Sequence, residues 1–233
     1  MRADESPFLA CWWGIGLEKA GLAAVRPHVG TYGRSAFELL PAAPSGLSGS
    51  LAWLSAAPRH QSHIADERAA VIAPAVEALN RNAAALELRL PATFLTFVES
   101  PDLHTRVRSP TDCFIDISAR PVPSTAGGYL VRFLADSQGC LFWYLYLQPG
   151  SADHGVVVSD SFFGTREEQW EEPNPNPEIE FVAESFEGFL WRFWLESEIW
   201  YAAYLEKTPI PAAGQEYVRQ YLERHSRAGQ TTR

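Results

Sequence analysis

The stretch from residue 130 to residue 160 limits the fold more than any other part of this 233-residue chain. Two runs of β-branched and aromatic residues, 129–134 and 140–147, flank the turn sequence Asp-Ser-Gln-Gly. A second turn then leads to a third run, at 156–158. Such runs, separated by short turns, are typical of antiparallel strands that follow one another in a sheet. The sequence therefore predicts a three-stranded antiparallel meander.

The middle run of this meander is apolar or aromatic on both of its faces. Because side chains alternate along a strand, its residues divide into two sets: Leu141, Trp143, Leu145 and Leu147 on one side, and Cys140, Phe142, Tyr144 and Tyr146 on the other. A central strand that is covered on both sides accounts for this pattern. A face that is left open for a partner accounts for it equally well.

A helix that follows the meander is expected to close the domain. Ser185 is a favourable N-cap, and Glu187 suits the positive end of the helix dipole. The helix is predicted to end near residue 205, before Pro209. We expect its apolar stripe, which has the i, i+3, i+4, i+7, i+8 spacing of a core-facing helix, to be buried against the sheet: Phe186, Phe189, Leu190, Phe193 and Trp194.

Further helices are predicted at 64–88, 90–98 and 215–225, and residues 229–233 are expected to fray. The first of these contains Pro74, which predicts a kink or a break. Its apolar residues near helical spacing are Ile64, Val71, Ala75, Leu79 and Leu86.

The beginning of the chain has weaker signals. A short strand is predicted at 11–17 and a helical turn at 34–40. Residues 41–58 are rich in Pro, Ala, Ser and Gly and are predicted to form a loop.

Acidic residues are concentrated in one part of the chain. Residues 153–198 contain twelve acidic residues and two arginines, a net charge of −10, whereas the whole chain carries −9. Such a charge repels nucleic acids and anionic membranes and attracts basic partners. The alternative is that these charges lie on a solvated loop and helix face that has no partner.

Within this stretch we identify five candidate protein-binding residues: Glu167, Glu168, Trp170, Glu171 and Glu172. A tryptophan among four glutamates is costly to leave in water, and tryptophan is enriched at the energetic centres of protein interfaces. A disordered acidic loop is the alternative interpretation. The expected partner is a basic protein, and we expect neither nucleic acid nor a membrane to bind.

Three features predict a cytoplasmic protein. The cysteines have no CxxC spacing, and Cys113 and Cys140 lie in predicted strands, so buried, reduced thiols are favoured for these two and for Cys11. The first ten residues lack the apolar core of a signal peptide. No run approaches the roughly 18 apolar residues of a membrane span.

No catalytic residue, metal site or cofactor is expected. His60 and His63 are three residues apart but have no further candidate ligands nearby. The chain contains neither a G-x-S-x-G motif nor a glycine-rich phosphate-binding loop. An enzyme stays an alternative if Asp136, His154 and Asp160 converge in one pocket with shifted pKa values.

Three pieces of residues 90–200 resemble a known family in their order and spacing. They are Leu90-Pro91-Ala92-Thr93-Phe94 at the start of a short helix, the meander with its Asp-Ser-Gln-Gly turn, and residues 183–190 at the start of the closing helix. With these pieces the chain resembles the SUKH superfamily, the Smi/Knr-like proteins. The resemblance implies an α+β fold with a twisted, mostly antiparallel sheet flanked by helices. We accordingly expect three parts: an N-terminal extension over 1–60 that packs on the body and is partly loop, a SUKH-like domain over 61–208, and a C-terminal helix with a frayed tail over 209–233.

The resemblance also implies a function. SUKH proteins bind other proteins, and bacterial members are often immunity proteins that neutralise toxins, frequently nucleases, of polymorphic toxin systems. It therefore predicts a non-catalytic protein-binding module with a basic toxin as the candidate partner. A regulatory or structural interaction domain with no toxin partner is the first alternative, and an uncharacterised enzyme is the second. The sequence leaves the identity of the partner and the oligomeric state open.

Overall fold

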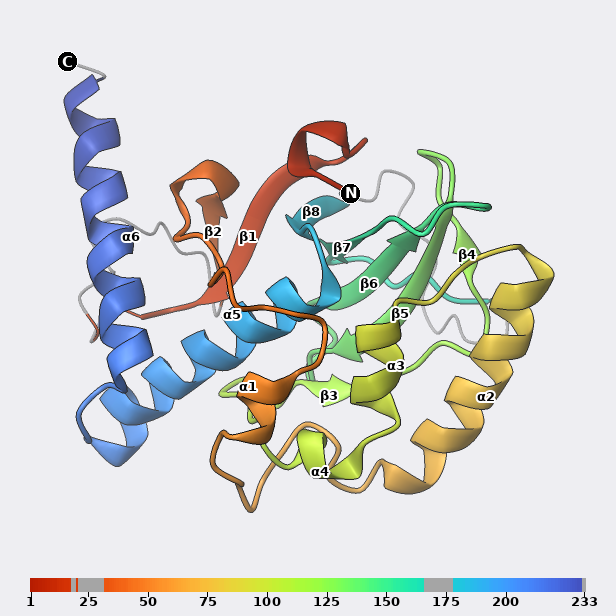
Figure 1. Cartoon of the computed structure of the whole chain (residues 1–233), viewed down its shortest axis with the longest axis horizontal. Helices are drawn as coiled ribbons and strands as arrows, with labels where there is room; N and C mark the ends of the chain where they lie inside the picture. The colour runs from red at the N-terminus through yellow and green to blue at the C-terminus, as the bar shows by residue number, and fades with distance from the viewer. Residues whose placement is uncertain (18–19, 21–31, 166–177, 232–233) are drawn as a thin grey trace.

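The computed structural model describes residues 1–17, 20, 32–165 and 178–231, and it joins their strands into one mixed sheet (Figure 1). The order of the strands is β2-β1-β8-β7-β6-β5-β3, and β4 pairs with β5. The strands are β1 (Leu9–Ile15), β2 (Tyr32–Ala36), β3 (Phe114–Ile115), β4 (Val122–Pro123), β5 (Tyr129–Ala135), β6 (Phe142–Leu147), β7 (His154–Ser159) and β8 (Glu180–Ala183).

Helices pack around this sheet, and the predicted α+β class is confirmed. The α-helices are α1 (Ala52–Ser55), α2 (Ala69–Ala85), α3 (Ala92–Val98), α4 (Pro101–His104), α5 (Phe186–Trp200) and α6 (Ala212–Thr231). Shorter helical segments are η1 (Ala3–Glu5), η3 (Phe37–Leu39) and the π-helical η4 (Tyr201–Glu206).

The predicted meander is confirmed, because β5, β6 and β7 are consecutive antiparallel neighbours. The Asp136 side chain closes the first turn: its Oδ1 accepts the backbone N–H of Gln138 at 2.9 Å. Gly139 adopts a φ of +70°, which costs a glycine little. β6 begins at Phe142, so Cys140 lies exposed on the turn and its prediction as a buried thiol is wrong.

The central strand β6 is covered on both faces. The side chains on the face of Trp143 belong to the main core, which lies under α3 and α5 (Figure 1). Those on the face of Tyr144 belong to a smaller core on the opposite side of the sheet. Residues from the N-terminus, from β3 and from the loop after β7 cover this second core: Met1, Ala3, Phe8, Phe114, Phe162 and Phe163. Of the two interpretations of this strand, the covered one is correct.

The first 40 residues build one edge of the sheet. β1 pairs antiparallel with β2 and parallel with β8, where Leu9 faces Glu180 and Ala10 faces Phe181. The strand predicted at 11–17 is therefore present, two residues earlier. The helical turn predicted at 34–40 is wrong over its first half, because pairing with β1 makes this part strand. The expected extension packs on the body by supplying two strands to its sheet.

The closing helix α5 follows the prediction. The Ser185 hydroxyl oxygen accepts the backbone N–H of Gly188 at 3.1 Å and so caps the helix. The chain continues through η4 and leaves the helix at Lys207, whose φ is +54°. The predicted stripe faces the main core, with three residues buried and two half-buried: Phe186, Phe189 and Leu190, then Phe193 and Trp194.

The inward face of α2 differs from the predicted one. The helix begins at Ala69, because Ile64 instead hydrogen-bonds through its backbone to two other segments. Val71 was expected to be inside and is 58% exposed. Pro74 lies within the helix, which is not divided there. The buried residues are Ile72, Val76, Leu79 and Ala83.

The last helix, α6, is longer at both ends than predicted and includes residues 229–231, whose fraying stays a prediction. Residues 232 and 233 lie outside the described part of the chain. In that described part, no helix combines the length and the apolar character that crossing a membrane requires.

Candidate functional site

The chain on either side of the predicted acidic segment is bonded to the sheet. The Tyr144 hydroxyl donates to the Ser161 carbonyl at 3.1 Å and accepts the Phe163 backbone N–H at 2.9 Å. The Ser159 hydroxyl donates to the Glu178 carbonyl at 2.6 Å. β6 and β7 thus anchor both flanks of the segment. The five candidate binding residues themselves lie outside the residues that the structure describes: Glu167, Glu168, Trp170, Glu171 and Glu172.

Part of the acidic stretch is buried and does not form a solvated face. Four of its glutamates are less than one-tenth exposed: Glu180, Glu187, Glu196 and Glu198. The first three each accept the indole N–H of a tryptophan that is distant in sequence, from Trp13, Trp53 and Trp12 respectively. These carboxylates hold the fold together, so only the remaining acidic residues contribute surface charge.

Glu196 joins three elements of the fold. Its Oε2 accepts the Trp12 indole N–H at 3.1 Å, and its Oε1 accepts the Tyr217 hydroxyl hydrogen at 2.7 Å. The carboxylate on α5 thereby links β1 to α6. Hydrogen bonds to a buried charged acceptor are among the stronger ones in proteins.

Glu198 forms a second buried cluster. The Arg108 guanidinium donates Nε and Nη2 to the two carboxylate oxygens, each at 2.9 Å, and His60 Nε2 lies 3.2 Å from Oε1. Burial acts to raise the pKa of Glu198, but the bonds from His60 and Arg108 outweigh it and the pKa is lowered. His60 therefore lies against the ion pair of Arg108 and Glu198. Within the described ranges no group of three or more His, Cys, Asp or Glu side chains could hold a metal ion.

The three residues of the enzyme alternative do not converge. His154 is the first residue of β7, and Asp160 follows the last. At about 3.3 Å per residue, the length of that strand places them roughly 20 Å apart. Asp136 lies at the Asp160 end, because Ala135 pairs with Phe142 and Phe142 pairs with Ser159.

Both Asp136 and His154 have structural roles. Asp136 Oδ2 accepts the Tyr32 hydroxyl hydrogen at 2.5 Å. His154 Nε2 accepts the Phe186 backbone N–H at 3.1 Å, at the start of α5. Burial and the nearby N-terminal ammonium group lower the pKa of His154, which keeps this nitrogen available as an acceptor.

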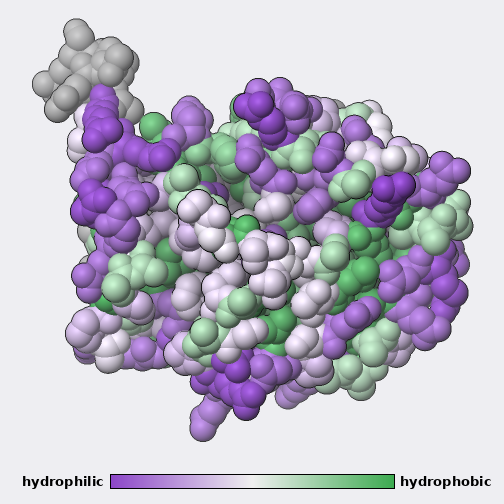
Figure 2. Space-filling view, in the orientation of Figure 1, coloured by the Kyte–Doolittle hydropathy of each residue, from purple (hydrophilic) through white to green (hydrophobic). Residues whose placement is uncertain are grey.

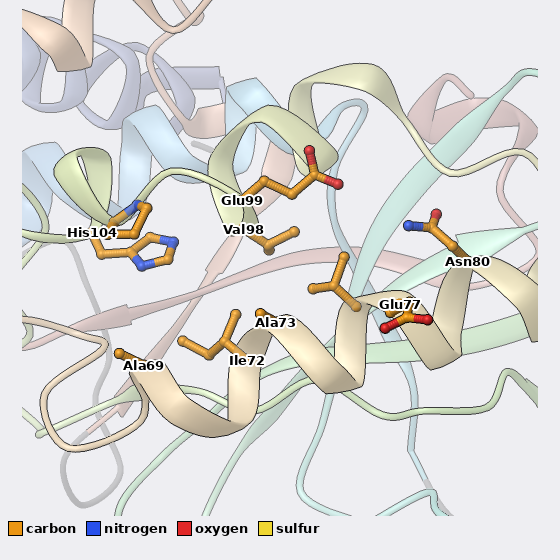
Figure 3. Close-up of a pocket in the computed structure, with 10 residues that line it drawn as sticks. Ala69, Ile72, Ala73, Glu77, Asn80, Val98, Glu99 and His104 are labelled. Atoms are coloured by element: carbon orange, nitrogen blue, oxygen red, sulfur yellow. The ribbon is translucent and has the colours of Figure 1, made fainter.

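The described surface also contains an apolar groove between α2 and the segment formed by α3 and α4 (Figure 3). Its volume is about 350 Å³. In Figure 2 apolar surface is visible between α3 and α2, with hydrophilic residues along its outer side. The α2–α3 groove is lined by Ala69, Ile72, Ala73, Val76, Glu77, Asn80, Val98, Glu99, Pro101 and His104.

His104 supplies a polar atom at one end of the groove. It is 3% exposed, and its Nε2 lies 2.8 Å from the Phe97 carbonyl oxygen. Because a carbonyl only accepts, Nε2 carries the proton and Nδ1 is the acceptor of the neutral ring. Burial lowers the pKa of His104 and favours this neutral form. No hydrogen bond to Nδ1 is found within the described ranges.

Two carboxylates lie on the walls of the groove. Glu77, with Asn80, lies on the α2 side, and Glu99 on the α3 side (Figure 3). Glu77 pairs with Arg81, whereas Glu99 forms no ion pair with any described residue. Glu99 is also the C-cap of α3, the end where a helix dipole disfavours negative charge. The groove therefore presents apolar surface together with hydrogen-bond acceptors, His104 Nδ1 and the carboxylates of Glu77 and Glu99, that described residues of the protein bond only in part.

Sequence analysis did not find this groove. Its floor consists of alanine, isoleucine and valine residues with no recognisable motif, and it forms only because α2 and α3 pack side by side. The one available signal was an acidic residue directly after the predicted helix at 90–98. Comparisons with models of protein families, with curated proteins and with solved structures give no match for this chain.

Proposed function

We propose that this protein is a non-catalytic module that binds a basic protein. The α2–α3 groove carries the proposal, because it combines exposed apolar surface with carboxylates that the fold itself does not neutralise fully. Such a combination suits a partner that inserts an apolar or long basic side chain.

The charge of the whole chain supports a basic partner. The net charge is −9, and residues 166–177 include four glutamates and Trp170. Acidic groups around a binding surface accelerate encounter with a basic protein and discourage acidic competitors. We retain Glu167, Glu168, Trp170, Glu171 and Glu172 as proposed contacts on this ground.

We further propose that the module is an immunity protein of the SUKH type, whose partner is a toxin. The resemblance over residues 90–200 supports this form, and so does the confirmed α+β fold with its meander and closing helix. A cytoplasmic location is part of the proposal, and three cysteines without a disulfide bond are compatible with it. If the protein binds no toxin, we propose instead that it is a regulatory interaction domain.

The test is binding to the purified, catalytically inactive product of the gene that lies next to this one. Association and dissociation rates are measured by surface plasmon resonance at two salt concentrations. We expect Glu77→Gln combined with Glu99→Gln to slow association several-fold, and the four-residue change of Glu167, Glu168, Glu171 and Glu172 to Gln to do the same. Screening by salt should weaken the wild-type interaction.

The matched control is Glu216→Gln, an exposed glutamate on α6 far from the groove, which should leave the rates unchanged. The three variants remove two, four and one negative charges, so effects in proportion to these numbers would mean that only overall charge matters and would remove the groove from the interface. An adjacent gene product that does not bind, or whose active form stays toxic to cells that also express this protein, would contradict the immunity role.

A further inference from the structure

A second cavity lies on a different side of α5, where the chain between η3 and α1 passes the start of the helix (Figure 1). Its volume is about 520 Å³. Pro41 and neighbouring residues form one wall, Ser185 and Gly188 of the first turn of α5 form another, and Arg224 of α6 closes it. Arg192, one turn further along α5 than Gly188, also lines the cavity.

Arg192 is a buried cation that forms no ion pair with a described residue, and the nearby buried carboxylate of Glu196 accepts its hydrogen bonds from Trp12 and Tyr217. Arg192 is 6% exposed, and its Nη2 donates to the Pro41 carbonyl at 2.9 Å. Its Nε is buried and has no hydrogen-bond partner among the described residues. The guanidinium carbon lies 5.2 Å from the Trp12 ring centroid and 5.8 Å from that of Phe37. Aromatic rings stabilise a cation but do not neutralise it.

Two other arginines with little exposed surface are neutralised by carboxylates. Arg132, 5% exposed, lies 2.6 Å from Asp116. Arg108 forms a bidentate ion pair with Glu198. No carboxylate of a described residue forms an ion pair with Arg192. A buried charge without a partner is costly, so an anion in the adjoining cavity would relieve a cost that the fold leaves in place.

The surroundings of Arg192 favour an anion of low charge. The first turn of a helix attracts negative charge. Arg224, half-buried, adds a second guanidinium and donates to the Glu38 carbonyl at 3.3 Å. Two exposed carboxylates, Glu38 and Glu184, also line the cavity and oppose a multiply charged anion. An anion with one negative charge, such as a single carboxylate, suits a cavity lined by two arginines and two carboxylates. Its two oxygens also match the two N–H donors that a planar guanidinium presents side by side.

We propose that this cavity is a binding site for a small molecule that carries a carboxylate, with Arg192 and Arg224 as the groups that hold it. The site is separate from the α2–α3 groove and does not depend on the proposed partner. Arg192 lies over the Trp12 ring, so we expect an anion on Arg192 to change the fluorescence of Trp12, one of eight tryptophans in the chain.

The experiment titrates the 233-residue protein with sodium acetate, with sodium chloride at matched ionic strength as the reference. Tryptophan fluorescence and the NMR signals of the arginine side chains are followed. We expect a saturable change with acetate, at least tenfold weaker binding in Arg224→Gln, and a clear loss in Arg192→Lys, which keeps the charge but not the fork. Arg219→Gln, on the same helix as Arg224 and exposed, is the matched control and should bind as wild type does.

A parallel titration with inorganic phosphate distinguishes the two classes of oxyanion. Phosphate that binds as tightly as acetate or more tightly would overturn the assignment to a carboxylate. No saturable response to acetate would overturn the site itself. Binding that persists unchanged in Arg224→Gln would place the anion elsewhere, and this variant decides the matter even if changes at Arg192 prevent folding.

Discussion

Truncation of Phe189 to alanine should destabilise the protein strongly. This residue is 1% exposed and lies where α5 crosses the sheet. Four aromatic rings surround it, with centroids 5.4 to 6.4 Å away: Phe133, Phe193, Trp12 and Trp143. Its removal leaves a cavity between elements that cannot move together without disturbing the sheet.

The expected loss is about 4–5 kcal/mol. Removal of a buried phenylalanine side chain costs about 3–5 kcal/mol, and the four ring contacts, each worth about 0.5–1.5 kcal/mol beyond the buried area, favour the upper end. The assay is equilibrium unfolding in urea, followed by tryptophan fluorescence. With a denaturant dependence of about 2–3 kcal/mol per molar urea, the midpoint should fall by roughly 1.5–2.5 M.

The control truncates an apolar residue that is not buried. Leu205 is 64% exposed, so Leu205→Ala should change the free energy of unfolding by less than about 0.5 kcal/mol. A loss below about 1 kcal/mol for Phe189→Ala would refute the assignment of this residue to the core. Similar losses for both variants would refute it as well.

Three further predictions concern titratable groups. The pKa of His154 in the folded protein is lowered below 6.5, so the stability that the neutral ring contributes should be complete above about pH 6.5 and lost as the pH falls toward the folded pKa. His154→Gln should therefore reduce the difference between the urea midpoints measured at pH 7 and at pH 5.5. The lowered pKa of Glu198 implies stability that is present above about pH 4.5 and lost as the pH falls through the folded pKa. Glu198→Gln should therefore make the thermal unfolding temperature less dependent on pH in the acid range. The same variant loses the ion pair with Arg108 and should be less stable at pH 7. Cys140 should react with a thiol reagent at least tenfold faster than the two buried cysteines, whose pKa burial raises to about 11, and mass spectrometry of partly labelled protein checks this.

Local patterns in the sequence determined much of the fold. Strands β5 to β7 follow from residue composition and the Asp136 turn, and α5 follows from its cap at Ser185 and its apolar spacing. These signals act between residues a few positions apart, so they are readable without knowledge of the rest of the chain. Where two helical registers were compatible, as in α2, the local signal was insufficient and Val71 was placed on the wrong face.

The tertiary structure alone decided which charges are available for function. Glu196 resembles any acidic helix residue in the sequence, yet it accepts a hydrogen bond from Trp12, 184 positions away. Arg192 is one of two arginines in an acidic stretch, yet it is buried and no carboxylate of the described residues pairs with it. Both outcomes depend on contacts between distant segments, and spacing along the chain carries no information about which distant segments will meet. Composition therefore predicts an acidic protein, while packing decides which acidic and basic groups are used by the fold and which stay available for a ligand.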